Sequence, residues 1–254
     1  MKALVARAAL ALVLASQAPA FAQAPTSQAG LQQLFEAEGR SPYPTPYAGT
    51  LVFSALASKY DSGHGHGYRN ELKIATPQRR SAAATREHFS AQVTPELPDG
   101  AKTIVAQYHV EGLDTILKVY VQDTADRQGL DGQAGNGVFD ILARIRGPEG
   151  KEITTALGTL RSGDTFGLDI RFNAGEAQVT VNQGGSVRRT ALTRIGIDGR
   201  KIYFKFGDYL QALDPATGKH TTSAAAWDQY YRQQHIDHSR IRFSDTVFER
   251  DAGD

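Results

Sequence analysis

Three short segments of this chain carry most of the side chains that could do chemistry, at residues 69–73, 107–109 and 203–211. Each alternates polar side chains with apolar ones, which is typical of a β-strand, where successive side chains point to opposite faces. Cations and amides can bind an anionic ligand, while an imidazole and phenols can transfer protons. The combination predicts a site that binds a polyanion and moves a proton.

The alternation assigns side chains to the polar face of each expected strand. The polar faces consist of Arg69, Glu71 and Lys73 in the first strand, Gln107 and His109 in the second, and Lys201, Tyr203, Lys205, Tyr209 and Gln211 in the third. In the second strand, Ile104, Ala106 and Tyr108 are expected on the opposite face. The opposite faces are largely apolar, so they should pack into a core.

In order along the chain, these segments resemble the three signature strands of the alginate lyases of polysaccharide lyase family 7. The family pattern is roughly Arg-Ser/Thr-Glu-Leu-Arg, then Gln-Ile/Val-His, then Tyr-Phe-Lys-Ala-Gly-x-Tyr-x-Gln. Three ordered matches are far more specific than one. The resemblance implies an all-β fold, a β-jelly roll sandwich of two antiparallel sheets with a concave substrate cleft. It also implies a lyase that cuts alginate or a related polyuronate by β-elimination.

The chain departs from that pattern at Asn70, at Tyr108 and at residues 206–208. Tyr108 stands where the family has Ile or Val, a position that the resemblance associates with the choice of uronate. Mannuronate, guluronate and glucuronate therefore all remain candidate monomers. Glucuronan lyases share this architecture and stay open as an alternative.

The candidate catalytic residues are Arg69, Gln107, His109 and Tyr209. Elimination removes the proton at C5 of a uronate, so charge that develops on the neighbouring carboxylate must be stabilised by donors already in place. Arg69 can offer a guanidinium fork and Gln107 an amide donor. A neutral His109 suits the role of base. The resemblance implies that Tyr209 is the acid towards guluronate and both base and acid towards mannuronate.

Further side chains are candidates for binding the substrate. Lys73, Lys118 and Lys205 are cations for neighbouring carboxylates, and Tyr120 and Tyr203 offer flat surfaces for sugar rings. Glu71 is expected to orient Arg69 or Lys205, and Gln211 to bind hydroxyl groups. The scheme needs no metal and no cofactor. The Gly-His-Gly-His-Gly run at 63–67 has no carboxylate or thiolate pattern that would complete a metal site. It is expected to be a mobile loop at the cleft mouth.

Two other classes of function compete with this interpretation. A non-catalytic carbohydrate-binding sandwich would use the same cationic and aromatic face, but it would not need Gln107, His109 and Tyr209 together. A glycoside hydrolase would need two carboxylates around the scissile bond, and the polar faces offer only Glu71. Taken alone, the face of residues 69–73 could also be a solvated, salt-bridged strand surface.

The ends and the composition limit where the protein acts. Residues 1–22 combine a charged start, a short apolar run and Ala20-Phe21-Ala22, which predicts a signal peptide cleaved after Ala22 and export to the periplasm or beyond. Without Lys2 and Arg7 the chain has 26 basic and 27 acidic residues, a net charge of −1. A polyanion must therefore bind to a local basic cleft. Nucleic acid and membrane partners are not expected, and a monomer is.

The remaining length fits one sandwich domain without disulfides, since the chain has no cysteine. Residues 23–48 are expected to form a flexible leader with a short helix over 28–38, followed by a jelly roll over 49–254. Strands are expected at 50–56, 69–74, 88–93, 103–110, 116–122, 139–146, 165–173, 176–182, 186–193, 201–210 and 240–249. One helix over 223–234 is expected as an insertion beside one end of the cleft.

Overall fold

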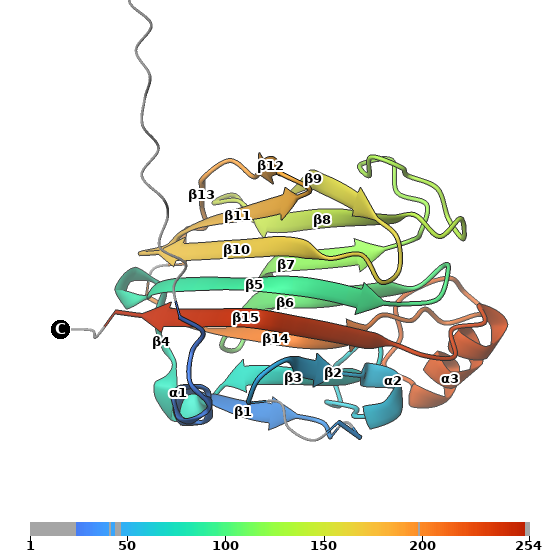
Figure 1. The fold of residues 1–254 in the computed structure, drawn as a ribbon, viewed down its shortest axis with the longest axis horizontal. Coiled ribbons are helices and arrows are strands. Elements are labelled where there is room, and N and C mark those ends of the chain that lie inside the picture. The colour runs from blue at the N-terminus through green and yellow to red at the C-terminus, as the bar shows by residue number, and fades with distance from the viewer. Residues whose placement is uncertain (1–23, 41, 44–46, 198, 252–254) are drawn as a thin grey trace, which may run out of the picture.

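The computed structural model of the chain describes residues 24–40, 42–43, 47–197 and 199–251, so the signal peptide expected at 1–22 lies outside it. Two antiparallel β-sheets pack on each other as a sandwich, with short helices at the periphery (Figure 1). The all-β jelly roll predicted from the sequence is thereby confirmed. Within the described residues, no helix is long and apolar enough to cross a bilayer.

The first sheet carries all three signature segments. Its strands follow the order β1-β3-β14-β6-β7-β8-β9, and β4 pairs with β14 at one end. Their bounds are β1 Phe35–Glu38, β3 Arg69–Ile74, β4 Arg80–Ser81, β6 Lys102–Val110, β7 Thr115–Gln122, β8 Phe139–Arg146, β9 Glu152–Leu160 and β14 Lys201–Leu210.

The second sheet covers the inner face of the first. Its strands follow the order β12-β11-β10-β5-β15-β2, and β13 pairs with β11. Their bounds are β2 Leu51–Phe53, β5 Arg86–Glu96, β10 Phe166–Asn173, β11 Glu176–Gln183, β12 Ser186–Arg189, β13 Thr193–Arg194 and β15 Arg240–Arg250. The helices are α1 Gln28–Leu34, α2 Ala55–Ser58 and α3 Ala224–Gln233, with 3₁₀ turns at Thr76–Gln78 and Ala82–Ala84.

Aromatic rings fill the space between the sheets. Four rings surround that of Phe206 at centroid distances of 4.9 to 5.8 Å: Phe35, Phe53, Phe89 and Phe243. Burying one such side chain contributes roughly 1.5–3 kcal/mol to folding. Because Phe204 and Phe206 of β14 point into this core, Tyr203 and Lys205 must point to the outer face of the first sheet.

The expectation of a flexible leader is wrong for residues 28–38. The short helix expected there ends at Leu34, and the chain continues as β1, which pairs with β3 from Phe35 opposite Ile74 to Glu38 opposite Glu71. Leu31 and Phe35 are buried in the core. These two apolar side chains, one helical turn apart, tie the segment to the sandwich.

Most of the other expected elements agree with the structure to within a few residues. The strand expected at 50–56 ends at Phe53 and is followed by α2, the strand expected at 186–193 is divided into β12 and β13, and β4 was not expected. Strand β9 was missed, because its Thr-Thr-Ala-Leu-Gly stretch alternates weakly between polar and apolar side chains. The expected helix is present as α3, where the Ser223 side chain accepts a hydrogen bond from the N–H of Ala226. Its Tyr231 contacts Leu210 at the end of β14, and its Trp227 packs against Tyr68, just before β3.

Gly207 lets β14 approach β3 closely. Its φ of 148° is rarely adopted by other residues, and a Cβ there would overlap the carbonyl of Asn70 and lie 2.7 Å from Glu71 Cα. The pairing of β14 with β6 is also irregular between Phe206 and Tyr209. This close, irregular stretch sets the position of Tyr209.

Candidate active site

Strand pairing aligns the predicted residues in rows that cross the first sheet. One row runs through Arg69, Tyr209, Ile104 and Tyr120, and a second through Lys73, Lys205, Gln107 and Lys118. Tyr203 pairs with His109. The predicted residues therefore meet on the outer face of the sheet, although they come from distant parts of the chain.

A pocket of about 230 Å³ opens on this face. Arg69, His109 and Tyr209 line it together with Lys118, Tyr120 and Gln211. Glu71 and Gln107 are fully buried, and Lys205 is nearly so. Arg144, which extends the second row beside Lys118, adds a further cation on β8.

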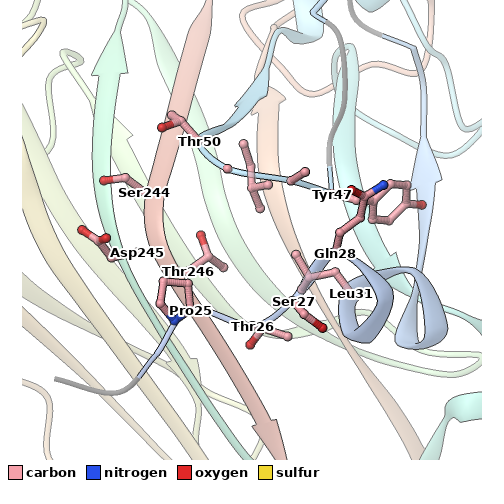
Figure 2. A pocket seen from close by; sticks show the side chains of 13 residues that line it. Pro25, Thr26, Ser27, Gln28, Leu31, Tyr47, Thr50, Ser244, Asp245 and Thr246 are labelled. Carbon is pink, nitrogen blue, oxygen red and sulfur yellow. The ribbon is translucent and has the colours of Figure 1, made fainter. Parts of the chain in front are cut away.

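A larger cavity of about 390 Å³ lies between the start of α1, the loop before β2 and β15 (Figure 2). Its lining carries hydroxyl groups and one carboxylate, that of Asp245, but no cation. A polyanion would find no counter-charge there. The chemistry therefore points to the smaller pocket.

Arg69 and Tyr209 form the centre of that pocket. The guanidinium carbon lies 3.8 Å from the centre of the Tyr209 ring, and Nη1 lies 3.7 Å from Glu71 Oε2. Cation–π contact and the buried carboxylate hold the guanidinium in place. Arg69 Nε is buried without a hydrogen-bond acceptor among the described residues. Because Arg69 lines the pocket, its guanidinium can meet a ligand carboxylate there.

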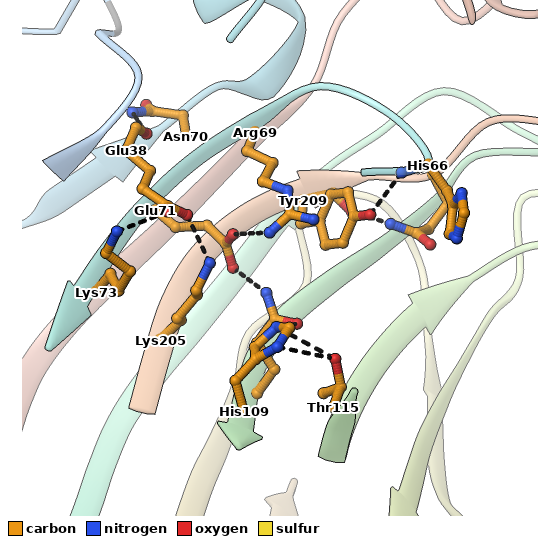
Figure 3. Close-up of polar contacts among 12 residues, drawn as sticks. Glu38, His66, Arg69, Asn70, Glu71, Lys73, His109, Thr115, Lys205 and Tyr209 are labelled. Atoms are coloured by element: carbon orange, nitrogen blue, oxygen red, sulfur yellow. Dashed lines mark hydrogen bonds and ion pairs between the residues drawn. The ribbon is translucent and has the colours of Figure 1, made fainter. Parts of the chain in front are cut away.

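A chain of hydrogen bonds links Glu71 to His109 (Figure 3). Gln107 Nε2 donates to Glu71 Oε1 at 2.5 Å, and Gln107 Oε1 lies 3.0 Å from His109 Nε2. Since an amide oxygen can only accept, His109 Nε2 carries the proton and Nδ1 keeps its lone pair. Burial raises the pKa of Glu71, although Lys205 and Arg69 oppose that rise. Glu71 thus orients both Arg69 and Gln107.

His109 is held in its neutral form. Burial lowers its pKa well below the usual range, and the cations Lys205, Arg69, Lys118 and Arg79 add to the effect. Its ring stacks on that of Tyr203 at 5.3 Å between centroids, and Thr115 Oγ1 lies 3.2 Å from Nε2. A neutral, well-oriented imidazole is what a base requires.

Two of the predicted binding cations are paired with Glu38 of β1. Lys205 Nζ lies 2.6 Å from Glu38 Oε2, and Lys73 Nζ lies 2.9 Å from Glu38 Oε1. Burial opposes ionisation of Glu38, but the two ammonium groups outweigh it and lower its pKa to about 2. The sequence did not point to Glu38, because only the long-range pairing of β1 with β3 brings it here.

Beyond Tyr209, the sheet continues as an apolar floor with cations around it. Ile104, Tyr120, Leu142 and Tyr209 pack together. Lys102 Nζ lies 4.7 Å from the centre of the Tyr120 ring, and the guanidinium carbon of Arg144 lies 5.1 Å from the same centre. Burial, followed by the charge of Arg144, lowers the pKa of Lys102 to about 8. Lys118 pairs with Glu152 at 2.8 Å. Lys102 and Arg144 were not among the predicted binding residues.

One predicted side-chain orientation is wrong. Ile104 faces the pocket instead of the core, because the pairing of β6 with β7 shifts register between Ile104 and Ala106, and this reverses the alternation. Tyr108 points to the core as expected, where its hydroxyl donates to Glu87 Oε2 at 2.8 Å. Tyr108 therefore cannot contact a sugar directly.

The Gly-His-Gly-His-Gly run lies against the pocket. The backbone N–H of His66 donates to the Tyr209 hydroxyl at 2.7 Å (Figure 3). The ring of His66 lies 4.7 Å from that of His220. Gln211 points back to its own strand, donating to the carbonyl of Tyr209 at 3.1 Å. Among the described residues, no group of three or more His, Cys, Asp or Glu side chains is arranged to hold a metal.

Comparison with known proteins agrees with this arrangement. A family model described as alginate lyase matches residues 23–247. The alginate lyase from Alteromonas sp. 272 is 34% identical, with a TM-score of 0.78 over 87% of this chain and 95% of that one. The family 18 polysaccharide lyase aly-SJ02 is also 34% identical, with a TM-score of 0.78 over 87% of this chain and 96% of that one.

A member of polysaccharide lyase family 7, the alginate lyase A1-II′, is 17% identical, with a TM-score of 0.53 over 83% of this chain and 84% of that one, and it shares the fold. No curated protein sequence matches the chain. The family match spans most of the chain, and two related structures exceed 30% identity. With its three signature strands gathered in one pocket, this chain belongs to the alginate lyase family.

Proposed function

We propose that this protein cleaves alginate, or a closely related polyuronate, by β-elimination at the 4-O-glycosidic bond. One observation carries the proposal: a single pocket brings together a guanidinium, a neutral imidazole and a phenol, in Arg69, His109 and Tyr209. A protein that only bound the polymer would have no use for a proton-transfer pair. The acidic polysaccharide is the partner implied by the family and by the cations around the pocket.

The first requirement is to stabilise charge on the uronate carboxylate. When the C5 proton leaves, the electron pair spreads onto that carboxylate as an enolate. Arg69 is the group best placed to stabilise this charge, because it lines the pocket and its guanidinium is fixed over the Tyr209 ring. A donor that is already oriented loses little free energy in reorganising during the reaction.

The second requirement is a base and an acid. Towards guluronate, His109 Nδ1 takes the C5 proton, the electron pair forms the C4–C5 double bond, and the C4–O bond breaks. The Tyr209 hydroxyl then protonates the departing oxygen. Towards mannuronate, where the C5 proton and the leaving group share a face, Tyr209 must begin as the phenolate. It takes the C5 proton and then returns that proton to the departing oxygen.

Gln107 acts differently from the role first expected for it. Its amide donates to Glu71 and its carbonyl faces His109, so it orients the imidazole instead of holding the substrate carboxylate. Lys73 and Lys205, each paired with Glu38, contribute less free positive charge than the sequence implied. The apolar floor at Ile104 and Tyr120 suits the apolar face of a pyranose ring.

The mature protein should be incubated with polymannuronate, polyguluronate, glucuronan and hyaluronate while the ultraviolet absorbance of the conjugated C4–C5 double bond is followed. A rise on either alginate block is the expected result. A rise on glucuronan alone would redirect the substrate assignment to a glucuronan lyase. Binding with no rise on any polymer would favour the carbohydrate-binding alternative, and new reducing ends without absorbance would indicate a hydrolase.

Replacing His109 with Ala should separate the two alginate blocks. We expect kcat on polyguluronate to fall by about 100-fold or more, because general base catalysis typically contributes that much. On polymannuronate the fall should be several times smaller, since Tyr209 performs both proton transfers there. The rates on the two homopolymers measure the difference. Equal losses on both blocks would contradict this division of roles.

We also propose that the protein is exported and acts as a monomer. The charged and apolar residues that precede Ala22 support cleavage at that position. Mass spectrometry of the protein recovered outside the cytoplasm would show whether the mature chain begins at Gln23. Light scattering on the purified protein would give its oligomeric state.

A further inference from the structure

The hydroxyl of Tyr209 is held by a backbone group from a different part of the chain. The N–H of His66 donates to the phenol oxygen at 2.7 Å (Figure 3). This bond occupies one lone pair of that oxygen, so the hydroxyl proton must point elsewhere. The mechanism requires that proton to point at the departing glycosidic oxygen. The contact therefore acts on the reacting atom itself.

His66 is fixed in place by several independent contacts. Its carbonyl accepts from the N–H of Ala212 at 2.8 Å, just beyond the end of β14. Its ring Nδ1 donates to the carbonyl of Thr221 at 3.3 Å. Next to it, Gly67 has a φ of 145°, and a Cβ there would overlap the carbonyl of Leu210. The loop can come this close to β14 only because residue 67 is glycine.

The inserted helix α3 supports the same loop. Trp227 Nε1 donates to the carbonyl of Thr221 at 2.9 Å, so this carbonyl joins α3 to His66. The Tyr231 hydroxyl donates to the carbonyl of Leu210 at 2.9 Å, next to Tyr209. Both aromatic side chains are buried. One series of hydrogen bonds thus connects the helix to the catalytic phenol through Thr221 and His66, and the Tyr231 bond holds the backbone next to Tyr209.

We propose that His66 is a positioning residue whose backbone N–H orients the Tyr209 hydroxyl, and that α3 holds the 63–67 loop in the conformation that makes this possible. The inference rests on the proposed lyase function, in which Tyr209 transfers protons. It gives a role to both the glycine-histidine run and the insertion. The imidazole of His66 is not required to touch the substrate.

The test compares two changes at one position. His66→Pro removes the N–H, whereas His66→Ala keeps it and removes the imidazole. We expect kcat on the wild type's preferred polymer to fall about 100-fold in His66→Pro and about threefold in His66→Ala, with KM within about threefold in both, because oriented donors at a reacting group have effects of that size. His64→Pro, two residues earlier in the loop, is the control for the effect of introducing a proline into this loop. Its kcat should fall by less than about tenfold.

Thermal melting and circular dichroism establish that each variant is folded. If His66→Pro does not fold, a backbone ester at position 66 removes the N–H without a ring. Retention of wild-type kcat by a folded His66→Pro or ester variant would overturn the proposal. An equal loss in His66→Ala would also overturn it, because the imidazole would then be the active group.

A second comparison tests the helix. Tyr231→Phe removes only the hydroxyl that donates to Leu210, and we expect kcat to fall about three- to tenfold with KM nearly constant, since one supporting hydrogen bond is lost. Trp227→Phe should also lower kcat, because it removes the hydrogen bond to the Thr221 carbonyl. Unchanged kcat in both folded variants would overturn the role given to α3.

An assay that needs no turnover separates this inference from the proposed function. In Tyr209→Phe the His66 amide loses its acceptor, so its hydrogen exchange should speed up at least about tenfold. If the wild type cleaves no polyuronate but the exchange rate rises, the proposed function fails while the contact stands. If the exchange rate does not change, the contact itself is disproved.

Discussion

Tyr209→Phe is expected to lower kcat on alginate by about three orders of magnitude, in the middle of the range for losing a general acid or base. The phenol is 5% exposed, and Arg69 lies 3.8 Å from the centre of its ring. Phenylalanine keeps that ring and the cation–π contact, so the affinity for polymer should change by less than about threefold. Initial rates and equilibrium binding of oligomannuronate measure the two quantities.

Tyr120→Phe is the matched control, because Tyr120 lies in the same pocket and contacts the same apolar floor. Its kcat should fall by less than about tenfold, because the change removes a hydroxyl that can contact a sugar and not one that transfers a proton. If the Tyr209 variant kept more than a tenth of the wild-type kcat, the phenol would not be the proton donor. A loss of polymer binding as large as the loss of kcat would show that the change had disturbed the pocket.

Arg69→Lys is expected to lower kcat/KM by about 100-fold or more, although the positive charge is retained. An ammonium cannot form the two parallel hydrogen bonds that a guanidinium offers to a carboxylate. It also cannot stack on the Tyr209 ring, and the buried Glu71 would lose its planar partner. Rates measured below KM on the preferred polymer report this loss directly.

Arg79→Lys provides the comparison. Arg79 also lies on a tyrosine ring, 4.0 Å from the centre of Tyr203, but it pairs with the exposed Glu111 at 3.0 Å. In Arg79→Lys, kcat/KM should fall by less than about fivefold, since an exposed ion pair contributes little. Equal losses at the two positions would mean that the effect at Arg69 comes from general electrostatics and not from a specific contact with the uronate.

The strand periodicity predicted much of the site. Alternation in β3 and β14 placed Arg69, Lys205 and Tyr209 on one face, and the strand pairing agrees with that placement. The same alternation failed in β6, where the register shift after Ile104 turned that side chain to the pocket. A bulge depends on the strand that pairs with β6, so the local sequence could not reveal it.

Groups from outside the signature segments depended on contacts between distant parts of the chain. Glu38 enters the site only because β1 pairs with β3, and the prediction of a flexible leader missed this. The His66 N–H is a backbone group, which every residue except proline carries, so no residue type marks its role. Its position depends on Gly67 and on contacts with residues 210–221.

The fold class, the helix at α3 and the chemical types that line the pocket could be predicted from local sequence, because side-chain alternation and helix capping act over a few residues. How those groups pair could not: Glu38 pairs with two lysines, Gln107 with Glu71 and His109, and the Tyr209 hydroxyl with a backbone amide. Such pairings depend on distance and direction across strands far apart in the chain, which residue types alone do not specify.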